Sequence, residues 1–192
     1  MEGGRKPLSK TGQKYAQRLR ELVMAEVHSP DGLNFGAVDQ PITAWASPNA
    51  HSKDIAAYFA SQGTVVEINA LADMNPGLLA NMTAEEIQAK YPTEFAEHAE
   101  DVYNYRYPRA ESFRDVAFRL EPIILEMERG RGHILVIAQK PILQCLYSYF
   151  TDLPETVCLP SVSFYPLLSL CPACAPANRA SLSSLAAVNP LC

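Results

Sequence analysis

The sequence predicts an α/β fold in which helices cover both faces of a largely parallel sheet. Short apolar runs rich in β-branched residues alternate with segments whose apolar residues recur at helical spacing. Residues 133–138 are apolar almost without a break, which is typical of a central strand buried on both faces. The chain has 192 residues, of which 48% are hydrophobic and 19% charged, a globular composition. We therefore predict a three-layer α/β/α sandwich.

Helix and strand signals alternate along the first 71 residues. Ser9 is a candidate cap for a helix that begins near Thr11, because its side chain can accept a hydrogen bond from the first turn. Ser47 followed by Pro48 predicts a second helix start, with the serine as cap and the proline in the first turn. In order, we expect a helix near 11–27, a loop at 28–41, a strand at 42–47, a helix ending at Gly63 and a strand at 64–71.

Capping patterns mark the helices of the second half. Thr83 and Glu86 form a capping box, and Pro92 requires this helix to end near Tyr91. The strongest helical periodicity runs over residues 112–129. In order, we expect a helix at 83–91, an aperiodic stretch rich in tyrosine and acid at 92–110, a helix at 112–129, a strand at 133–138, a helix at 141–150 and a last strand at 162–170.

The C-terminal residues differ in composition from the rest of the chain. Residues 171–192 contain three prolines, three cysteines and one charged residue. We predict one domain over residues 1–170 and a weakly ordered tail over 171–192. Cys171 and Cys174 have the CxxC spacing, but a structural zinc site needs a second pair at suitable spacing. No metal and no cofactor are therefore predicted.

Charge and cysteine content exclude several classes of partner. Lysine and arginine total 16 against 21 aspartates and glutamates, for a net charge of −5, so nucleic acid is not an expected ligand. No apolar run approaches the roughly 18 uncharged residues of a membrane span. The N-terminus lacks the apolar core of a signal peptide. Five cysteines, an odd number, suit a reducing compartment, so we expect a cytoplasmic protein that does not bind membranes.

Polar residues follow three of the predicted strands. His51 comes after the first strand, Asp73 after the second, and Gln139 with Lys140 after the strand at 133–138. Ligands of open α/β sheets bind at the carboxyl ends of the strands. These residues are therefore the first candidates for a functional site.

Several segments together resemble the fructose-2,6-bisphosphatase branch of the histidine phosphatase superfamily. The segments are Leu8-Ser9-x-x-Gly12-x-x-Tyr15-Ala16, Thr83-Ala84-Glu85-Glu86-Ile87, Tyr105-Arg106-Tyr107-Pro108 and Glu111-Ser112-Phe113-Arg114-Asp115. The resemblance covers about residues 3–170 and implies a phosphoglycerate mutase-like fold. In that family the bisphosphatase domain follows a 6-phosphofructo-2-kinase domain, and catalysis proceeds by phosphoryl transfer to a histidine and then hydrolysis.

The catalytic positions that the resemblance implies are degenerate. Only eight residues precede Ser9, so the family's first central strand, with its arginine-histidine-glycine triplet, is expected to be absent. The second arginine corresponds to His51, the general acid glutamate to Asp73, and the second histidine to Gln139. A glutamine side chain does not titrate, and a histidine offers fewer donors than an arginine. The resemblance therefore implies a site with no working catalytic residue.

The substrate-binding positions are also mostly replaced. By resemblance, the positions that differ from the family hold Ala84, His98, Val102, Phe113, Lys140 and Gln144, while Arg106, Glu111 and Ser112 are retained. Arg106 and Lys140 are a candidate remnant of an anion site, against the alternative of a solvated pair.

The leading hypothesis is a catalytically inactive bisphosphatase-like module in fructose 2,6-bisphosphate metabolism. It would act as a scaffold or regulatory partner of a 6-phosphofructo-2-kinase domain, carried upstream or on another chain, with homo-oligomerisation left open. One alternative is a phosphatase that uses His51 and Asp73 on another phosphoester, and another is a non-catalytic sugar-phosphate binder at Arg106 and Lys140. Loss of a central strand would expose unpaired backbone groups, which predicts a fragment or a chain of low stability alone.

Overall fold

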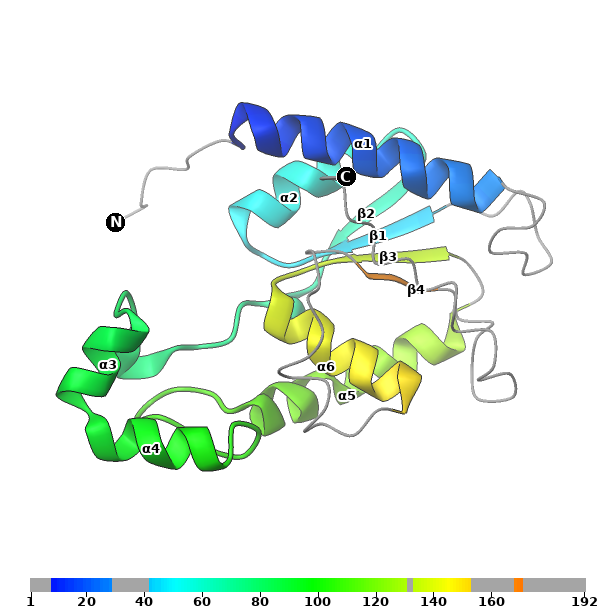
Figure 1. Ribbon diagram of the computed structural model, residues 1–192. Helices are drawn as coiled ribbons and strands as arrows, with labels where there is room; N and C mark the ends of the chain where they lie inside the picture. Colours follow the sequence, from blue (N-terminus) through cyan, green and yellow to red (C-terminus); the bar gives the residue numbers. More distant parts are fainter. Residues whose placement is uncertain (1–7, 29–41, 131–132, 153–167, 171–192) are drawn as a thin grey trace.

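A four-stranded sheet organises the chain in the order β2-β1-β3-β4 (Figure 1). The computed structural model describes residues 8–28, 42–130, 133–152 and 168–170. The strands are β1 (Ile42–Ala46), β2 (Gly63–Glu67), β3 (His133–Ile137) and β4 (Leu168–Leu170). β1 pairs in parallel with both β2 and β3, whereas β4 is antiparallel to β3. The prediction of a largely parallel sheet is confirmed.

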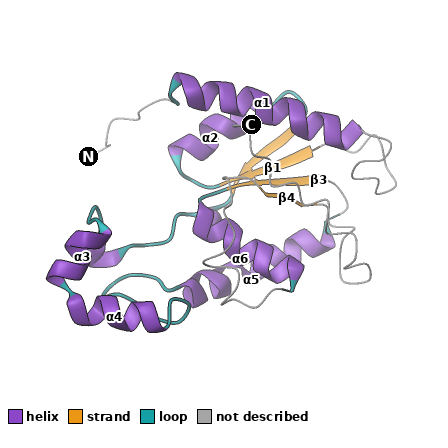
Figure 2. Cartoon of the chain, viewed as in Figure 1, coloured by secondary structure: helices purple, strands orange, loops and turns teal. Residues whose placement is uncertain are grey.

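Helices cover both faces of this sheet, which confirms the three-layer arrangement (Figure 2). The helices are α1 (Lys10–His28), α2 (Ala50–Ala56), α3 (Ala84–Lys90), α4 (Pro92–Glu100), α5 (Phe113–Arg129) and α6 (Lys140–Thr151), with 3-10 turns at Ala57–Phe59, Asn69–Leu71 and Gly77–Leu79. Figure 1 shows α1 and α2 on one face and α5 and α6 on the other. No helix among the described residues is long and apolar enough to cross a membrane.

The apolar core is divided into two clusters by the sheet. Along β3, Val136 packs into the cluster of α5 and α6, whereas Leu135 and Ile137 pack into the cluster of α1 and α2. This alternation follows from the two-residue period of a strand. All three side chains are almost fully buried. The prediction of a central strand buried on both faces is therefore confirmed.

The predicted helix caps at Ser9 and Thr83 are present, and the structure adds a third cap at Ser112. Ser9 Oγ accepts from Gly12 N at 3.1 Å, and Thr83 forms its capping box with Glu86. Ser112 Oγ accepts from Asp115 N at 3.2 Å, while Asp115 Oδ2 accepts from Ser112 N at 2.8 Å. Each cap satisfies backbone N–H groups that a first helical turn leaves free.

Four local predictions are wrong, each for an identifiable reason. Gly63, the predicted end of the second helix, is the first residue of β2, where its close approach to Ile42 O leaves no room for a Cβ, and α2 ends at Ala56. α2 is capped by Asn49 and not by Ser47, because Ser47 N donates to Ile137 O and so extends the pairing of β1 with β3 by one residue. The second strand stops at Glu67, and residues 69–71 form a 3-10 turn instead. The aperiodic stretch after Tyr91 contains α4, which Pro92 begins, since proline fits the first turn of a helix.

The edge of β3 that faces away from β1 bears on the expected loss of the first central strand. Within the described residues, α1 is the one element before β1, and the edge of β3 away from β1 pairs with β4 over three residues. Residues 1–7, residues 162–167 of the last predicted strand and the tail 171–192 lie outside the described residues. The absent strand and the division at residue 170 therefore stay predictions.

α3 and α4 form a separate unit beyond the edge at which β1 and β3 end (Figure 1). The two helices follow each other with only Tyr91 between them. Neither helix contains a fully buried residue. Residues 78–106, which contain the two helices, are called here the α3–α4 unit. The two helices thus lack an apolar core of their own.

Candidate functional site

The carboxyl ends of the three parallel strands lie level with one another. Ala46, the last residue of β1, is in register with Glu67 of β2 and Ile137 of β3. Beyond the last pairs, Ile68 N donates to Ala46 O and Ser47 N donates to Ile137 O, both at 2.9 Å. The segments that carry His51, Asp73 and Gln139 therefore leave the same edge of the sheet, as predicted.

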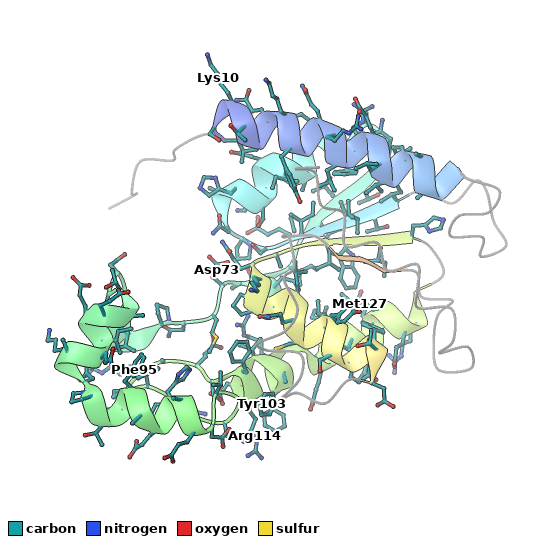
Figure 3. The ribbon with its side chains drawn as sticks, in the orientation of Figure 1. Lys10, Asp73, Phe95, Tyr103, Arg114 and Met127 are labelled. Carbon is teal, nitrogen blue, oxygen red and sulfur yellow. The ribbon has the colours of Figure 1, made fainter. Side chains whose placement is uncertain are left out.

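Asn49 connects two of these segments. Its Nδ2 donates to Asp73 Oδ2 at 2.8 Å, and its Oδ1 accepts from His51 N at 2.9 Å, which makes it the cap of α2. The side chains of His51 and Asp73 are both exposed. Figure 3 shows Asp73 where the chain leaves the sheet toward α3. The carboxylate of Asp73, which the resemblance places at the family's acid position, is thus held by an amide donor.

Gln139 and Lys140 lie at the start of α6. Gln139 caps the helix with its backbone, since its carbonyl accepts from Ile142 N at 3.1 Å and Leu143 N at 3.2 Å. Its side chain makes no capping bond and is exposed. The Lys140 side chain is exposed as well and has no ion-pair partner among the described residues. The first turn of α6 therefore presents the Lys140 side chain, whereas Pro141 has no N–H and the N–H groups of Ile142 and Leu143 are bonded to Gln139 O.

Arg106 is paired with a carboxylate. Its Nη2 contacts Asp115 Oδ1 in an ion pair, and 59% of its side chain remains exposed. Asp115 also accepts from Ser112 N and Oγ, both at 2.8 Å. The Ser112 N–H, assisted by Arg106, holds the pKa of Asp115 below its usual range. The positive charge of Arg106 is thus offset by a firmly ionised partner, which weakens the predicted anion site with Lys140.

His98, which the resemblance places where the family has an arginine, is a stacked imidazole. The ring of His98 stacks on Tyr107 with centroids 5.1 Å apart, and Tyr105 meets both rings edge-on. Burial lowers the pKa of His98, so the neutral ring is favoured. Burial and then the nearby Glu97 raise the pKa of Tyr105. This cluster offers a phosphate no fixed positive charge.

Arg119 forms the largest polar network near the site. Its Nε and Nη2 donate to Glu111 Oε1 and Oε2, each at 3.1 Å, in a two-pronged pair. Its Nη1 donates to the carbonyls of Ala70 at 2.7 Å and Ala72 at 3.0 Å. Sequence reasoning missed both Arg119 and Asn49. The order Ser47-Pro48-Asn49 was a signal for Asn49, whereas nothing local to Arg119 points to residues 70 and 72.

The described residues hold no group of three or more His, Cys, Asp or Glu side chains that could bind a metal ion. Cys171 and Cys174 lie outside the described residues. His133 starts β3 at the opposite end of the strand, where burial lowers its pKa and leaves Nδ1 without a partner. Among the described residues, His51 is therefore the histidine that follows the carboxyl end of a strand most closely in the sequence, since β1 ends at Ala46.

The comparisons with known proteins assign this fold to a family of phosphatase-type domains. Residues 3–159 match the Histidine phosphatase superfamily (branch 1), and the chain belongs to this family. It is a fructose-2,6-bisphosphatase-like histidine phosphatase domain. The resemblance seen in the sequence is confirmed.

Two curated relatives show how much of a longer protein is matched. The fructose-2,6-bisphosphatase of Saccharomyces cerevisiae is 35% identical over 153 residues, which are 80% of this chain and 31% of that protein. The 6-phosphofructo-2-kinase/fructose-2,6-bisphosphatase of Gallus gallus is 36% identical over 151 residues, 78% of this chain and 29% of that protein. The chain thus spans about a third of the length of these relatives.

Solved structures support the fold. Bacillus stearothermophilus YhfR superposes with a TM-score of 0.65 at 21% identity and covers 88% of this chain and 81% of its own. The alpha-ribazole phosphatase from Shigella flexneri has a TM-score of 0.60 at 18% identity and covers 82% of this chain and 75% of its own. At these identities the likeness concerns the fold alone.

Proposed function

We propose that this chain is a catalytically inactive fructose-2,6-bisphosphatase-like domain with a scaffold or regulatory role. The observation that carries the proposal is Gln139, which stands at the start of α6 where the resemblance expects the second catalytic histidine. Its carboxamide is exposed, does not titrate, and cannot exchange a proton with a phosphoryl group at neutral pH. A site of this kind loses several orders of magnitude in rate when one of its central groups is removed.

The remaining strand-end residues support the same proposal. Asp73, which the resemblance places at the acid position, is one methylene shorter than a glutamate, and its Oδ2 is bound by Asn49 Nδ2 at 2.8 Å. A general acid must reach the leaving oxygen to donate its proton to it. His51 replaces an arginine and supplies fewer donors to a phosphoryl group.

The charge distribution near the strand ends also disfavours phosphoryl transfer. Catalysis of this reaction depends on fixed positive groups around the transferred phosphoryl. Arg106 and Arg119 are each paired with a carboxylate. Lys140 is the remaining cation of the predicted set. One exposed lysine cannot replace a ring of arginines and histidines around a dianion.

The relatives suggest the kind of partner. Several of them are named as 6-phosphofructo-2-kinase/fructose-2,6-bisphosphatase, and this chain spans only a minor part of their length. We propose that the chain works in fructose 2,6-bisphosphate metabolism, next to a 6-phosphofructo-2-kinase domain on the same or another polypeptide. A cytoplasmic location and self-association belong to this proposal as well.

Phosphate release from fructose 2,6-bisphosphate tests the proposal. The purified chain is compared with Gln139→Ala, which removes the carboxamide, and with Gln139→His, which restores the family residue. We expect release at the level of the buffer for the native chain and for Gln139→Ala. Release by the native chain above Gln139→Ala would contradict the proposal.

A second candidate is sugar-phosphate binding without turnover. It is favoured by the exposed side chain of Lys140 at the start of α6, which has no ion-pair partner in the described part of the chain. Addition of fructose 2,6-bisphosphate should then raise the Tm, and Lys140→Ala should abolish this rise. Lys53→Ala is the matched control, because Lys53 is already paired with Glu67 at 2.8 Å. An equal rise in both variants would rule out a site at Lys140.

A further inference from the structure

Two chain segments connect the α3–α4 unit to the sheet, and they run side by side. Residues 72–77 lead outward and residues 107–112 lead back; together they are called the neck. Glu111 N donates to Asn75 O at 2.9 Å, and Asn75 N donates to Glu111 Oε2 at 2.8 Å. Leu78 N donates to Pro108 O at 3.2 Å just beyond. The outward and returning segments are thus joined by main-chain and side-chain hydrogen bonds.

Gly77 shows how closely the two segments approach. A Cβ at this position would lie 2.5 Å from both Pro108 O and Ala110 N, closer than real Cβ contacts occur. Its φ of +59° lies in the left-handed region, which favours glycine. Asn75 Oδ1 accepts from Gly77 N at 2.9 Å and fixes the turn. The neck therefore has one tight, specific geometry.

Arg119 fastens this neck to the body of the protein. It lies on α5, which packs against the sheet, and its guanidinium reaches both segments at once. It binds the carbonyl of Ala72, where the outward segment begins, and that of Ala70 in the 3-10 turn just before it. On the returning segment it binds the Glu111 carboxylate that also accepts from Asn75 N. The side chains of Arg119 and Glu111 are only 23% and 25% exposed. Solvent therefore screens this pair less than an exposed surface pair.

Beyond the neck, the α3–α4 unit meets the start of α5 through the ion pair of Arg106 with Asp115, in which Arg106 is 59% exposed, and through Arg114 N, which donates to Tyr103 O at 3.2 Å. Its two helices bury no side chain completely, so apolar packing against the body cannot hold them firmly. Figure 3 shows Phe95 and Tyr103 in this unit, well apart from Asp73 at the base of the neck. The carbonyl of Ala72, which Arg119 binds, directly precedes Asp73.

We propose that Arg119 is a positioning residue that locks the neck, and that it thereby sets the placement of both the α3–α4 unit and Asp73 relative to the strand ends. This role does not depend on the proposed function, because it acts through Glu111 and two backbone carbonyls whether or not a phosphoryl group is bound. When Arg119 is removed, the neck opens locally while the sheet stays folded.

Amide hydrogen exchange on the full-length chain tests the proposal. In Arg119→Gln, the amides of Asn75 and Glu111 should exchange about tenfold faster or more, since charge-assisted hydrogen bonds that close the neck are lost. The amides of β1 and β3 should keep their native rates. Arg18→Gln is the matched control, because Arg18 pairs with Glu21 on the exposed face of α1 at 3.5 Å and does not touch the neck.

Two results would overturn the proposal. Native exchange rates at Asn75 and Glu111 would show that the neck is closed without Arg119. If amide exchange is faster by the same factor in the neck, in β1 and in β3, Arg119 supports global stability instead. If Arg119→Gln does not fold, Arg119→Lys keeps the charge without the fork and is judged by the same two criteria.

Discussion

Asn49 donates to the Asp73 carboxylate while it caps α2, so one side chain joins the exits of β1 and β2. The amide is needed for this double role, because one end must accept and the other must donate. Serine and aspartate also cap helices well, but neither can do both with this geometry. An asparagine at position 49 therefore contributes more than a helix cap, because it also holds the Asp73 side chain beside the carboxyl end of β1.

Asn49→Asp separates the two roles. The substituted side chain still caps α2, but it places a second carboxylate against Asp73. We expect a loss of about 1 kcal/mol in the free energy of unfolding at pH 7. Adding Asp73→Asn to this variant should restore most of it, because an amide at position 73 can then donate to the carboxylate at position 49. Denaturant unfolding of both variants measures the effect, and a loss that Asp73→Asn does not reduce would contradict the bond.

Gly77→Ala tests the close approach within the neck. The substitution places a Cβ against Pro108 O and Ala110 N and demands a left-handed residue with a side chain. We expect destabilisation by about 2 kcal/mol or more. Gly12→Ala is the control, because Gly12 lies in α1 and its Cβ would meet the end of the Leu8 side chain at 3.1 Å. Thermal unfolding should show a change of less than about 1 kcal/mol for this control.

Asp115 should make stability depend on acidic pH. Its pKa in the folded chain lies below the ordinary value because Ser112 N and Arg106 stabilise the carboxylate. The stabilisation is thus complete above the unfolded pKa of about 3.9 and is lost as the pH falls through the lower folded pKa. Asp115→Asn should flatten the stability profile below pH 4. An unchanged slope there would show that Asp115 is not held ionised.

His98 should add a dependence at higher pH. Burial lowers its pKa in the folded chain, so protonation favours the unfolded state. Its contribution is present above the unfolded pKa of about 6.5 and is lost as the pH falls from there toward the folded value. His98→Phe keeps an aromatic ring beside Tyr107 and should be less sensitive between pH 7 and 5. Parallel profiles for native and variant chains would contradict this role.

The sequence predicted the fold well because its signals are local or periodic. The buried run of β3, the capping box at Thr83 and the stripe of α5 each lie within one segment, and each is present. The errors came where tertiary contacts override local preference. Ser47 extends the sheet to Ile137, which moves the helix cap to Asn49.

The site was predicted less completely than the fold. Strand order and register explain why His51, Asp73 and Gln139 leave one edge, and this followed from the α/β pattern. The partners of the charged residues did not follow from it. Arg119 binds the carbonyls of Ala70 and Ala72, which lie 49 and 47 positions before it in the chain, and such contacts carry no local signal.

The most direct test of the central claim is a search for a phosphorylated histidine during turnover. The purified chain is mixed with fructose 2,6-bisphosphate that is radiolabelled at the 2-phosphate, quenched in alkali and analysed for labelled protein, with an active bisphosphatase as positive control. The account predicts no protein-bound label. Label that is stable in base, labile in acid and carried by a histidine would contradict it.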